Sequence, residues 1–153
     1  MLGKLINTGE ETAPLVLRVM LGLVFFPHGA QKVLGWFGGH GLAGTLDFFT
    51  QTMGVPLILA LLVIAAEFLG ALGLIVGLLT RVAAFGIGCV MLGAVALVHW
   101  QNGFFMNWGG NQGGEGFEYH LLALAISVAL MISGGGRFSL DGLLKSRSGA
   151  HRS

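Results

Sequence analysis

Long apolar runs alternate with short polar breaks along this chain, and the pattern predicts four helical spans. The runs cover residues 14–33, 56–79, 82–98 and 119–133. About 20 helical residues cross the ~30 Å hydrocarbon core of a bilayer, so the last two runs are slightly short for it. We therefore expect an all-α protein, a four-helix transmembrane bundle formed by residues 1–145 and followed by a basic tail at 146–153.

The breaks between the runs contain residues that end or begin helices. A glycine-rich loop at 35–41 follows the first run, Thr80-Arg81 forms a tight turn, and a polar loop covers 101–116. Gly134-Gly135-Gly136 ends the last run. The first run contains Arg18 and lacks a small-residue cleavage site, which favours a retained helix over a cleaved signal peptide.

Composition supports a membrane protein. Of 153 residues, 54% are hydrophobic and only 10% are charged, whereas soluble domains carry about 25% charged residues. So little charge cannot cover a water-facing surface, which argues against a monomeric soluble domain. The net charge of +1 gives no indication of a nucleic-acid partner. The single cysteine, Cys89, excludes an internal disulfide and a cysteine-based metal cluster.

The distribution of positive residues predicts the orientation. With four spans, one side of the membrane receives both termini and the 80–81 turn, and it holds Lys4, Arg81, Arg137, Lys145, Arg147 and Arg152. The opposite side holds only Lys32. Because positive loops remain in the cytoplasm, we expect both termini to be cytoplasmic, in a multi-pass protein of a bacterial-type inner (plasma) membrane.

Several ionisable residues lie in or at the ends of the spans: Arg18, His28, Lys32, Glu67, His99, Glu118 and His120. A charge at the bilayer centre costs at least ~2.5–3.5 kcal/mol, so it normally faces a partner or a cavity. Glu67 lies near mid-membrane, and the long side chain of Arg18 can reach toward it. An Arg18–Glu67 pair is therefore predicted. It would either lock two helices together or tune a carboxylate for proton relay.

The remaining ionisable residues gather on the outer membrane face. His28 and Lys32 share one helix face, and the topology brings them to the same side as His99 and either Glu118 or His120. A quinone head group could bind there, with Phe25, Trp36 and Phe105 around the ring. A metal or haem site is less well supported, because the usual ligand spacings are absent. The simplest alternative is a set of polar residues facing headgroup water.

The order of several short motifs resembles the DoxX family of small four-helix membrane proteins. The motifs are Arg18 with Leu21-Gly22, His28-Gly29-x-x-Lys32, Glu67 with Gly70, Gly77-Leu78-x-Thr80-Arg81, His99, Asn102-Gly103-Phe104-Phe105, Glu118-Tyr119 and Gly134-x-Gly136-Arg137-x-Ser139-Leu140-Asp141. They span most of residues 12–144. Gly134-Gly135-Gly136 departs from the Gly-Pro-Gly often found there. The resemblance implies a component of a membrane oxidoreductase. Relatives in the family include the small subunit of a thiosulfate:quinone oxidoreductase.

We therefore expect a quinone-interacting subunit of a membrane oxidoreductase system. The catalytic or proton-exchange residues would be His28, Lys32, His99, Glu118 and His120, and the cofactor-binding or supporting residues Arg18, Glu67, Phe25, Trp36 and Phe105. No metal ligands are predicted. The chain offers proton carriers but no evident electron carrier, so a redox partner protein or a homo-oligomer is implied. The alternatives are a non-catalytic anchor or assembly subunit and a small-solute or lipid-binding membrane protein.

Overall fold

The computed structural model describes residues 6–150 of the chain, which are mostly helical and contain no strand. The all-α prediction is confirmed. The first long helix, α2 (Thr12–Leu34), is continuous despite Pro27 and ends at Gly35 in the left-handed conformation. One face of α2 is buried over about three turns, and it carries Arg18, Leu21, Gly22, Phe25 and Gly29. This face of α2 therefore points into the bundle.

The second and third long helical stretches each contain a π-helical segment. The second consists of α4 (Leu57–Ala65), the π segment η3 (Ala66–Gly70) and α5 (Ala71–Val76). The third consists of α6 (Thr80–Ala94), the π segment η4 (Val95–His99) and the 3-10 turn η5 (Trp100–Asn102). Single π turns inside α-helices are rare and are frequent at functional sites.

Shorter elements connect and follow these stretches. The connection from α2 to α4 contains η1 (Trp36–Gly38), α3 (Gly41–Asp47) and η2 (Phe48–Thr52). α7 (Glu118–Ser133) follows a long loop, and α8 (Leu140–Ala150) follows the glycine turn at 134–136. Helical stretches 12–34, 57–76 and 80–102 are long and apolar enough to cross a membrane. α7 has only 16 residues, so a fourth crossing stays a prediction.

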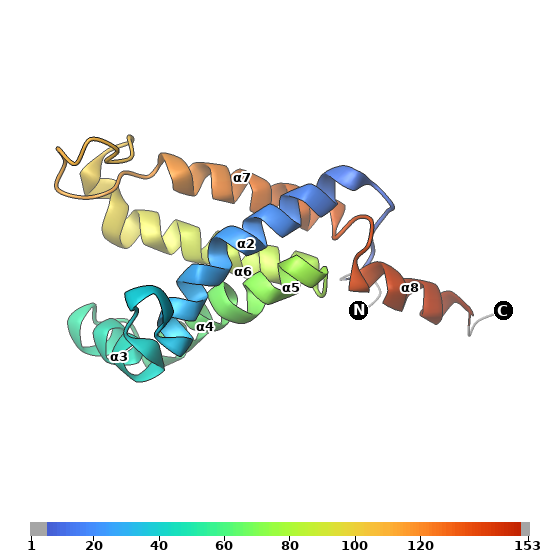
Figure 1. The fold of residues 1–153 in the computed structure, drawn as a ribbon, viewed down its shortest axis with the longest axis horizontal. Helices are drawn as coiled ribbons and strands as arrows, with labels where there is room; N and C mark the ends of the chain where they lie inside the picture. Colours follow the sequence, from blue (N-terminus) through green and yellow to red (C-terminus); the bar gives the residue numbers. More distant parts are fainter. Residues whose placement is uncertain (1–5, 151–153) are drawn as a thin grey trace.

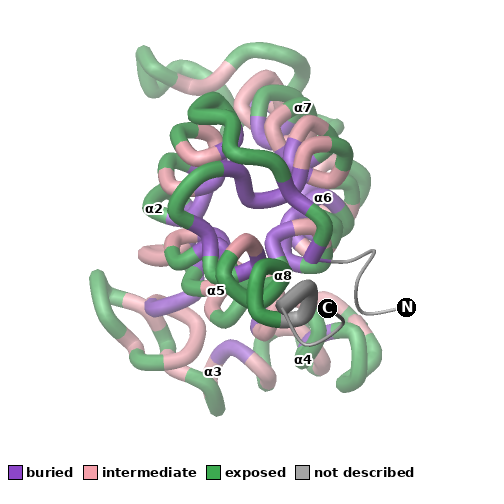
Figure 2. The backbone as a smooth tube through the Cα atoms, turned by 90° about the vertical axis from the view of Figure 1, so that its right-hand side faces the viewer, coloured by how far each residue is buried: buried purple, intermediate pink, exposed green. Residues whose placement is uncertain are grey.

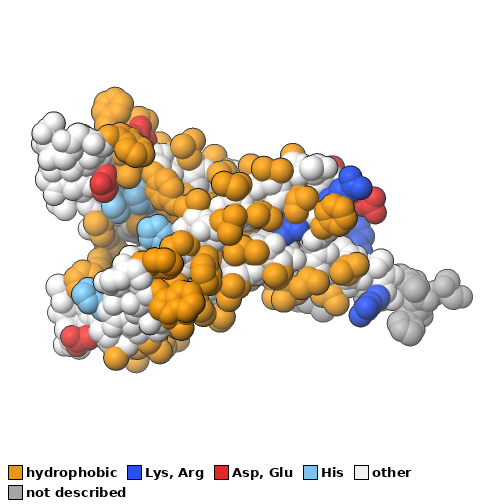
Figure 3. Space-filling view, in the orientation of Figure 1, with side chains coloured by type: hydrophobic (Ala, Val, Ile, Leu, Met, Phe, Trp, Pro, Cys, Tyr) orange, Lys and Arg blue, Asp and Glu red, His pale blue; other side chains and the backbone are white. Residues whose placement is uncertain are grey.

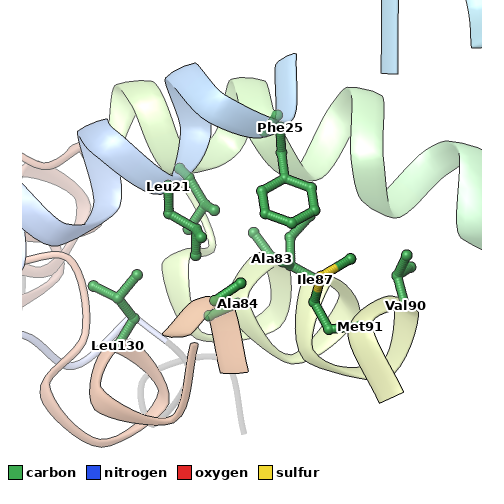
Figure 4. Packing of buried hydrophobic residues seen from close by; sticks show 11 residues of the cluster. Leu21, Phe25, Ala83, Ala84, Ile87, Val90, Met91 and Leu130 are labelled. Atoms are coloured by element: carbon green, nitrogen blue, oxygen red, sulfur yellow. The ribbon is translucent and has the colours of Figure 1, made fainter. Parts of the chain in front are cut away.

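The long helices surround a common apolar core. α7 runs beside α6, and α2 crosses them with α5 on its other flank (Figure 1). Seen from the α8 end, the buried parts of α2, α5, α6 and α7 point toward one interior (Figure 2). Leu21 and Phe25 of α2 meet Ile87 and Met91 of α6 there, and Leu130 of α7 completes the packing (Figure 4).

The outer surface of the bundle is apolar, as a lipid-facing surface must be. Large hydrophobic side chains are exposed on every long helix, and Figure 3 shows them (orange) along the body of the molecule, with charged groups concentrated toward its ends. Cys89 is exposed on α6. An exposed apolar surface of this extent in water would cause aggregation, whereas in a bilayer it contacts lipid tails.

The two ends of the bundle differ in their charged groups. One end contains the glycine turn at 134–136 and α8, and the other contains α3 and the loop between η5 and α7 (Figure 1). On the face drawn in Figure 3, Lys and Arg (blue) lie toward the α8 end and histidines (pale blue) lie at the opposite end. Lys32, which pairs with Glu67, does not belong to the group at the α8 end. Lys4 and Arg152 lie outside the described residues. Which end faces the cytoplasm stays a prediction.

Candidate functional site

Arg18 is buried at the α8 end of the bundle, and all its hydrogen bonds go to backbone carbonyl groups. Its side chain is 1% exposed. Nε donates to the carbonyl of Gly135 at 2.8 Å. Nη1 donates to the carbonyls of Leu74 at 3.0 Å and Ile75 at 2.6 Å. Nη2 donates to the carbonyls of Arg137 at 3.2 Å and Phe138 at 2.9 Å. The last carbonyls of a helix have no partner within it and carry partial negative charge. Arg18 therefore joins α2 to the end of α5 and to the segment before α8.

The predicted Arg18–Glu67 ion pair is wrong, because Glu67 pairs with Lys32 instead. Arg18 lies at the level of Leu74, which is about 10 Å along the helix from Glu67 at 1.5 Å per residue. Lys32 reaches Glu67 because Gly29 lets α2 approach η3 closely. A Cβ atom at Gly29 would lie 2.6 Å from the Glu67 carbonyl oxygen and from the Phe68 Cα.

Asp141 completes the polar network at the α8 end. Its carboxylate accepts hydrogen bonds from the N–H groups of Leu79 at 2.8 Å and Thr80 at 2.9 Å, where α6 begins. It thereby caps α6 from a different helix, in the way that acidic N-cap residues stabilise helix starts. Its negative charge also acts on Arg18. The residues from 134 to 141 therefore hold helices together, and we assign them a structural role.

The opposite end of the bundle contains the ionisable residues that carry the candidate site, which we call the histidine site. It comprises His28, Lys32, Glu67, His99, Tyr119 and His120, with Phe25 between them. Glu67 is 7% exposed and Lys32 is 22% exposed, so the ion pair has one partner inside the bundle and one near solvent. Glu67 lies in the π segment η3. Its charge acts on both His28 and Tyr119, so both lie within electrostatic range of one carboxylate.

His99 and His120 form a close pair in the histidine site. Their ring centroids are 4.1 Å apart, and His99 lies in the π segment η4. His99 Nδ1 lies 2.8 Å from the carbonyl oxygen of Glu115, which can only accept a hydrogen bond. Nδ1 therefore carries the proton, and Nε2 of a neutral His99 is left as an acceptor.

Aromatic rings connect the ion pair to the histidine pair. Phe25 lies 6.1 Å from His28 and 6.4 Å from Tyr119, and Tyr119 lies 5.5 Å from His120, measured between ring centroids. The Tyr119 hydroxyl and His120 Nδ1 are buried and have no hydrogen-bond partner among the described residues. Buried polar groups without partners are uncommon in folded proteins and call for an explanation.

Three of the predicted site residues make other contacts. Glu118 accepts a hydrogen bond at 2.8 Å from the N–H of Met106, and so fastens the loop before α7. Trp36 packs against Phe26 and Phe37. Phe105 contacts Phe104 and is 67% exposed. Sequence reasoning could place these residues at the correct end of the bundle. It could not predict the direction of each side chain, because the residues lie in or beside irregular connections.

Tyr119 was not predicted as a site residue. One feature of the sequence indicates it, because Tyr119 is the only tyrosine and lies at the start of an otherwise apolar run. The pattern of ionisable residues favours Glu118 and His120 instead, which are two residues apart and so point in different directions. The structure resolves this choice: His120 faces His99, whereas Glu118 faces the loop.

The histidine site opens at the surface of the molecule. Figure 3 shows the end of the bundle opposite α8 divided into two lobes, with a hollow between them and histidine side chains (pale blue) around it. His28 is exposed and His120 is buried, so the site extends from the surface into the bundle. Within residues 6–150, no group of three or more His, Cys, Asp or Glu side chains has the geometry to hold a metal ion.

Comparison with known proteins identifies the family. The family model of DoxX matches residues 13–100, which is more than half of the chain. The chain belongs to the DoxX family. It is 32% identical over 124 residues to the Bacillus subtilis protein named "Putative oxidoreductase CatD", a match that covers 81% of this chain and 82% of the relative.

A second relative is named for its location. The DoxX chain is 31% identical over 139 residues to "Inner membrane protein YqjF" of Escherichia coli, covering 90% of this chain and 96% of the relative. No solved structure matches the chain significantly. The DoxX match ends at residue 100, so it includes Arg18, the Lys32–Glu67 pair and His99, whereas Tyr119 and His120 lie beyond it.

Proposed function

We propose that this DoxX protein is a four-pass protein of a bacterial-type inner membrane and binds the head group of a quinone as a subunit of an oxidoreductase system. The α8 end would face the cytoplasm and the histidine site the opposite side. The names of the two relatives support the membrane and the chemistry. The observation that carries the proposal is a buried hydroxyl and a buried ring nitrogen without partners, beside a histidine pair and a flat phenyl ring.

The residues of the histidine site fit a quinone head group. The two carbonyl oxygens of a quinone accept hydrogen bonds, and the Tyr119 hydroxyl and His120 Nδ1 are buried groups that can donate them. Phe25 presents an apolar ring beside Tyr119, which suits a planar ring with delocalised electrons. Two of the residues first expected around the ring, Trp36 and Phe105, are not needed for this assignment.

A bound quinone would supply chemistry that takes up two electrons and two protons. The residues of this chain would manage the protons. Glu67 is buried and Lys32 reaches toward solvent, so the ion pair connects the interior of the site with water. His28 lies near the same carboxylate and is exposed, so it is placed between the interior of the site and water. The electrons would come from a redox partner protein, or from a partner group in a homo-oligomer.

Direct binding measurements test this proposal. The full-length protein in mild detergent is titrated with short-chain ubiquinone and menaquinone analogues, and binding is followed by quenching of tryptophan fluorescence. We expect saturable binding to the wild type. Tyr119→Phe and His120→Gln each remove a hydrogen bond worth about 1 kcal/mol, which weakens binding about fivefold. His40→Gln is the matched control, because His40 is an exposed histidine outside the site.

Two results would contradict the proposal. The first is a wild-type protein that binds neither quinone. The second is equal binding by the wild type, Tyr119→Phe and His120→Gln. If Tyr119→Phe and His120→Gln leave binding unchanged while substitution of Arg18 has large effects, the result would support the non-catalytic anchor or assembly subunit instead. The orientation is tested separately by a C-terminal reporter fusion, and a periplasmic reporter would contradict it.

A further inference from the structure

A groove at the base of α8 has an apolar floor and a basic residue at its edge. Its volume is about 290 Å³, and it is lined by Leu78, Leu140, Leu143, Leu144 and Arg147. The four lining residues of α8 recur at steps of three, one and three, so they occupy one face of the helix. Leu143 is 60% exposed. An exposed leucine face on a helix beyond the spans requires a covering partner.

The floor of the groove is continuous with the lipid-facing surface of the bundle. Leu78 follows Gly77, the C-cap of α5, and Leu79 and Val82 beside it at the start of α6 are also exposed. The backbone holds α8 against this point, because Asp141 caps α6 and its N–H donates to the Gly77 carbonyl at 2.9 Å. An acyl chain that lies along the bundle can therefore continue into the groove without crossing a polar barrier.

The charge around the groove favours an anionic group. Arg81, Arg137, Lys145 and Arg147 lie in the helices and turns of this end. The Asp141 carboxylate is buried and fully engaged with two N–H groups. Glu10 and Glu11, the exposed acids of the described part of this end, leave an excess of positive charge. We expect this end to face the cytoplasmic leaflet, where anionic lipids are concentrated.

We propose that the groove binds one anionic phospholipid, with an acyl chain along the leucines and the phosphate group at Arg147. A lipid matches both parts of the groove, since it joins an apolar chain to a charged head. A protein helix from a partner or a second copy would cover the leucines, but it would not require continuity with the lipid-facing surface. This site is independent of the quinone proposal.

Native mass spectrometry of the full-length protein tests the lipid site. The protein in detergent is titrated with phosphatidylglycerol and with phosphatidylcholine of identical acyl chains. We expect the wild type to retain phosphatidylglycerol about fivefold better, from about 1 kcal/mol for one basic residue near the headgroups. Arg147→Gln should abolish this preference, and Leu143→Asn should reduce retention of both lipids. Arg137→Gln is the matched control, because Arg137 stacks over Phe138 and does not line the groove.

Three outcomes would overturn the lipid site. The first is equal retention of the two lipids by the wild type. The second is an identical loss of preference in Arg137→Gln and Arg147→Gln, which would indicate general surface charge rather than a groove. The third is a concentration-dependent dimer that Leu143→Asn abolishes while lipid retention is unchanged, which would assign the groove to a second copy of the chain.

Discussion

The α8 end, which contains Arg18, and the histidine site both bury charged groups, but they differ in the hydrogen-bond partners of those groups. Arg18 donates five hydrogen bonds to backbone carbonyls, and Asp141 accepts two from backbone N–H groups. In the histidine site, side chains face one another, and the Tyr119 hydroxyl and His120 Nδ1 have no partner among the described residues. The charged groups at the α8 end are saturated and fix the structure, although the buried Thr80 hydroxyl there also lacks a partner among the described residues. The unpartnered groups of the histidine site leave hydrogen bonds available to a ligand.

The backbone geometry also differs between these two regions. Around Arg18 the partners are carbonyls at the end of α5 and in the glycine turn, where helices normally lack partners. At the histidine site, Glu67 and His99 lie in π segments. A π turn departs from regular helical geometry and recurs at sites of function. The difference teaches that an ionisable residue inside a membrane bundle has to be interpreted from its partners, and not from its depth alone.

Substitution of Arg18 should have the largest effect on stability. Arg18→Leu leaves five carbonyls and Asp141 without their cation, and we expect a loss of about 3–5 kcal/mol in the free energy of unfolding. This corresponds to a fall of about 6–20 °C in the apparent Tm of the protein in detergent. Arg18→Lys should recover part of the loss, because lysine keeps the charge but has fewer donors. An unchanged Tm for Arg18→Leu would remove the structural assignment of this end.

Gly29 tests the close approach that creates the Lys32–Glu67 pair. In Gly29→Ala the new Cβ would meet backbone atoms of Glu67 and Phe68 at 2.6–2.7 Å, so α2 must move away. Overpacking of this kind costs about 1–3 kcal/mol. Gly93→Ala is the matched control, because nothing lies within 4 Å of a Cβ at Gly93. The measurement is the apparent Tm of both variants, which should be lower for Gly29→Ala than for Gly93→Ala. Equal Tm values would contradict the close contact.

Asp141 tests whether the capping of α6 stabilises the α8 end. Asp141→Ala removes the acceptor for the N–H groups of Leu79 and Thr80, and loss of such a cap costs about 0.5–2 kcal/mol. Asp141→Asn retains one oxygen acceptor and should lose less. Glu10→Ala, at an exposed position, provides the control. The apparent Tm should fall in the order Glu10→Ala, Asp141→Asn, Asp141→Ala, and a different order would argue against the cap.

Glu67→Gln should have the smallest effect on stability, despite the burial of Glu67. The amide keeps the shape of the side chain, and Lys32 is 22% exposed and can extend to water. We expect a loss of about 1 kcal/mol or less, together with weaker quinone binding in the same preparation. A loss as large as that of Arg18→Leu would show that the Lys32–Glu67 pair is structural, and the contrast between the two ends would disappear.

The sequence predicts much of the architecture, because hydrophobic runs and glycine breaks are local features. The ends of the described helices lie within a few residues of the predicted runs, and the buried stripe on α2 follows from its spacing. α8 was not predicted, because its few leucines, although at helical spacing, lie among glycine, serine and basic residues and form no long apolar run. It depends on tertiary contacts, namely the Asp141 cap and the hydrogen bond of Lys145 to the Thr8 carbonyl.

Individual partners were harder to predict than elements. Arg18 and Glu67 have opposite charges, and the long side chain of Arg18 can reach toward mid-membrane, where Glu67 is predicted to lie, so pairing them was the simplest hypothesis. Backbone carbonyls carry no sequence signal, and for this reason they were overlooked as partners for Arg18. Topology predicts that His99 shares a membrane face with Glu118 or His120, since the end of the third run and the start of the fourth lie there. Only the structure shows that His120 is the residue that contacts His99.

The length of α7 has a consequence for the lipids around the molecule. Its 16 residues extend about 24 Å, roughly 6 Å less than the hydrocarbon thickness of a typical bilayer. If the predicted crossing by α7 is correct, this hydrophobic mismatch thins the bilayer locally or draws headgroups inward. Tyr119 and His120 lie in the first turn of this helix. Water and headgroups would therefore come nearest to the core of the protein at the histidine site, where proton exchange is proposed.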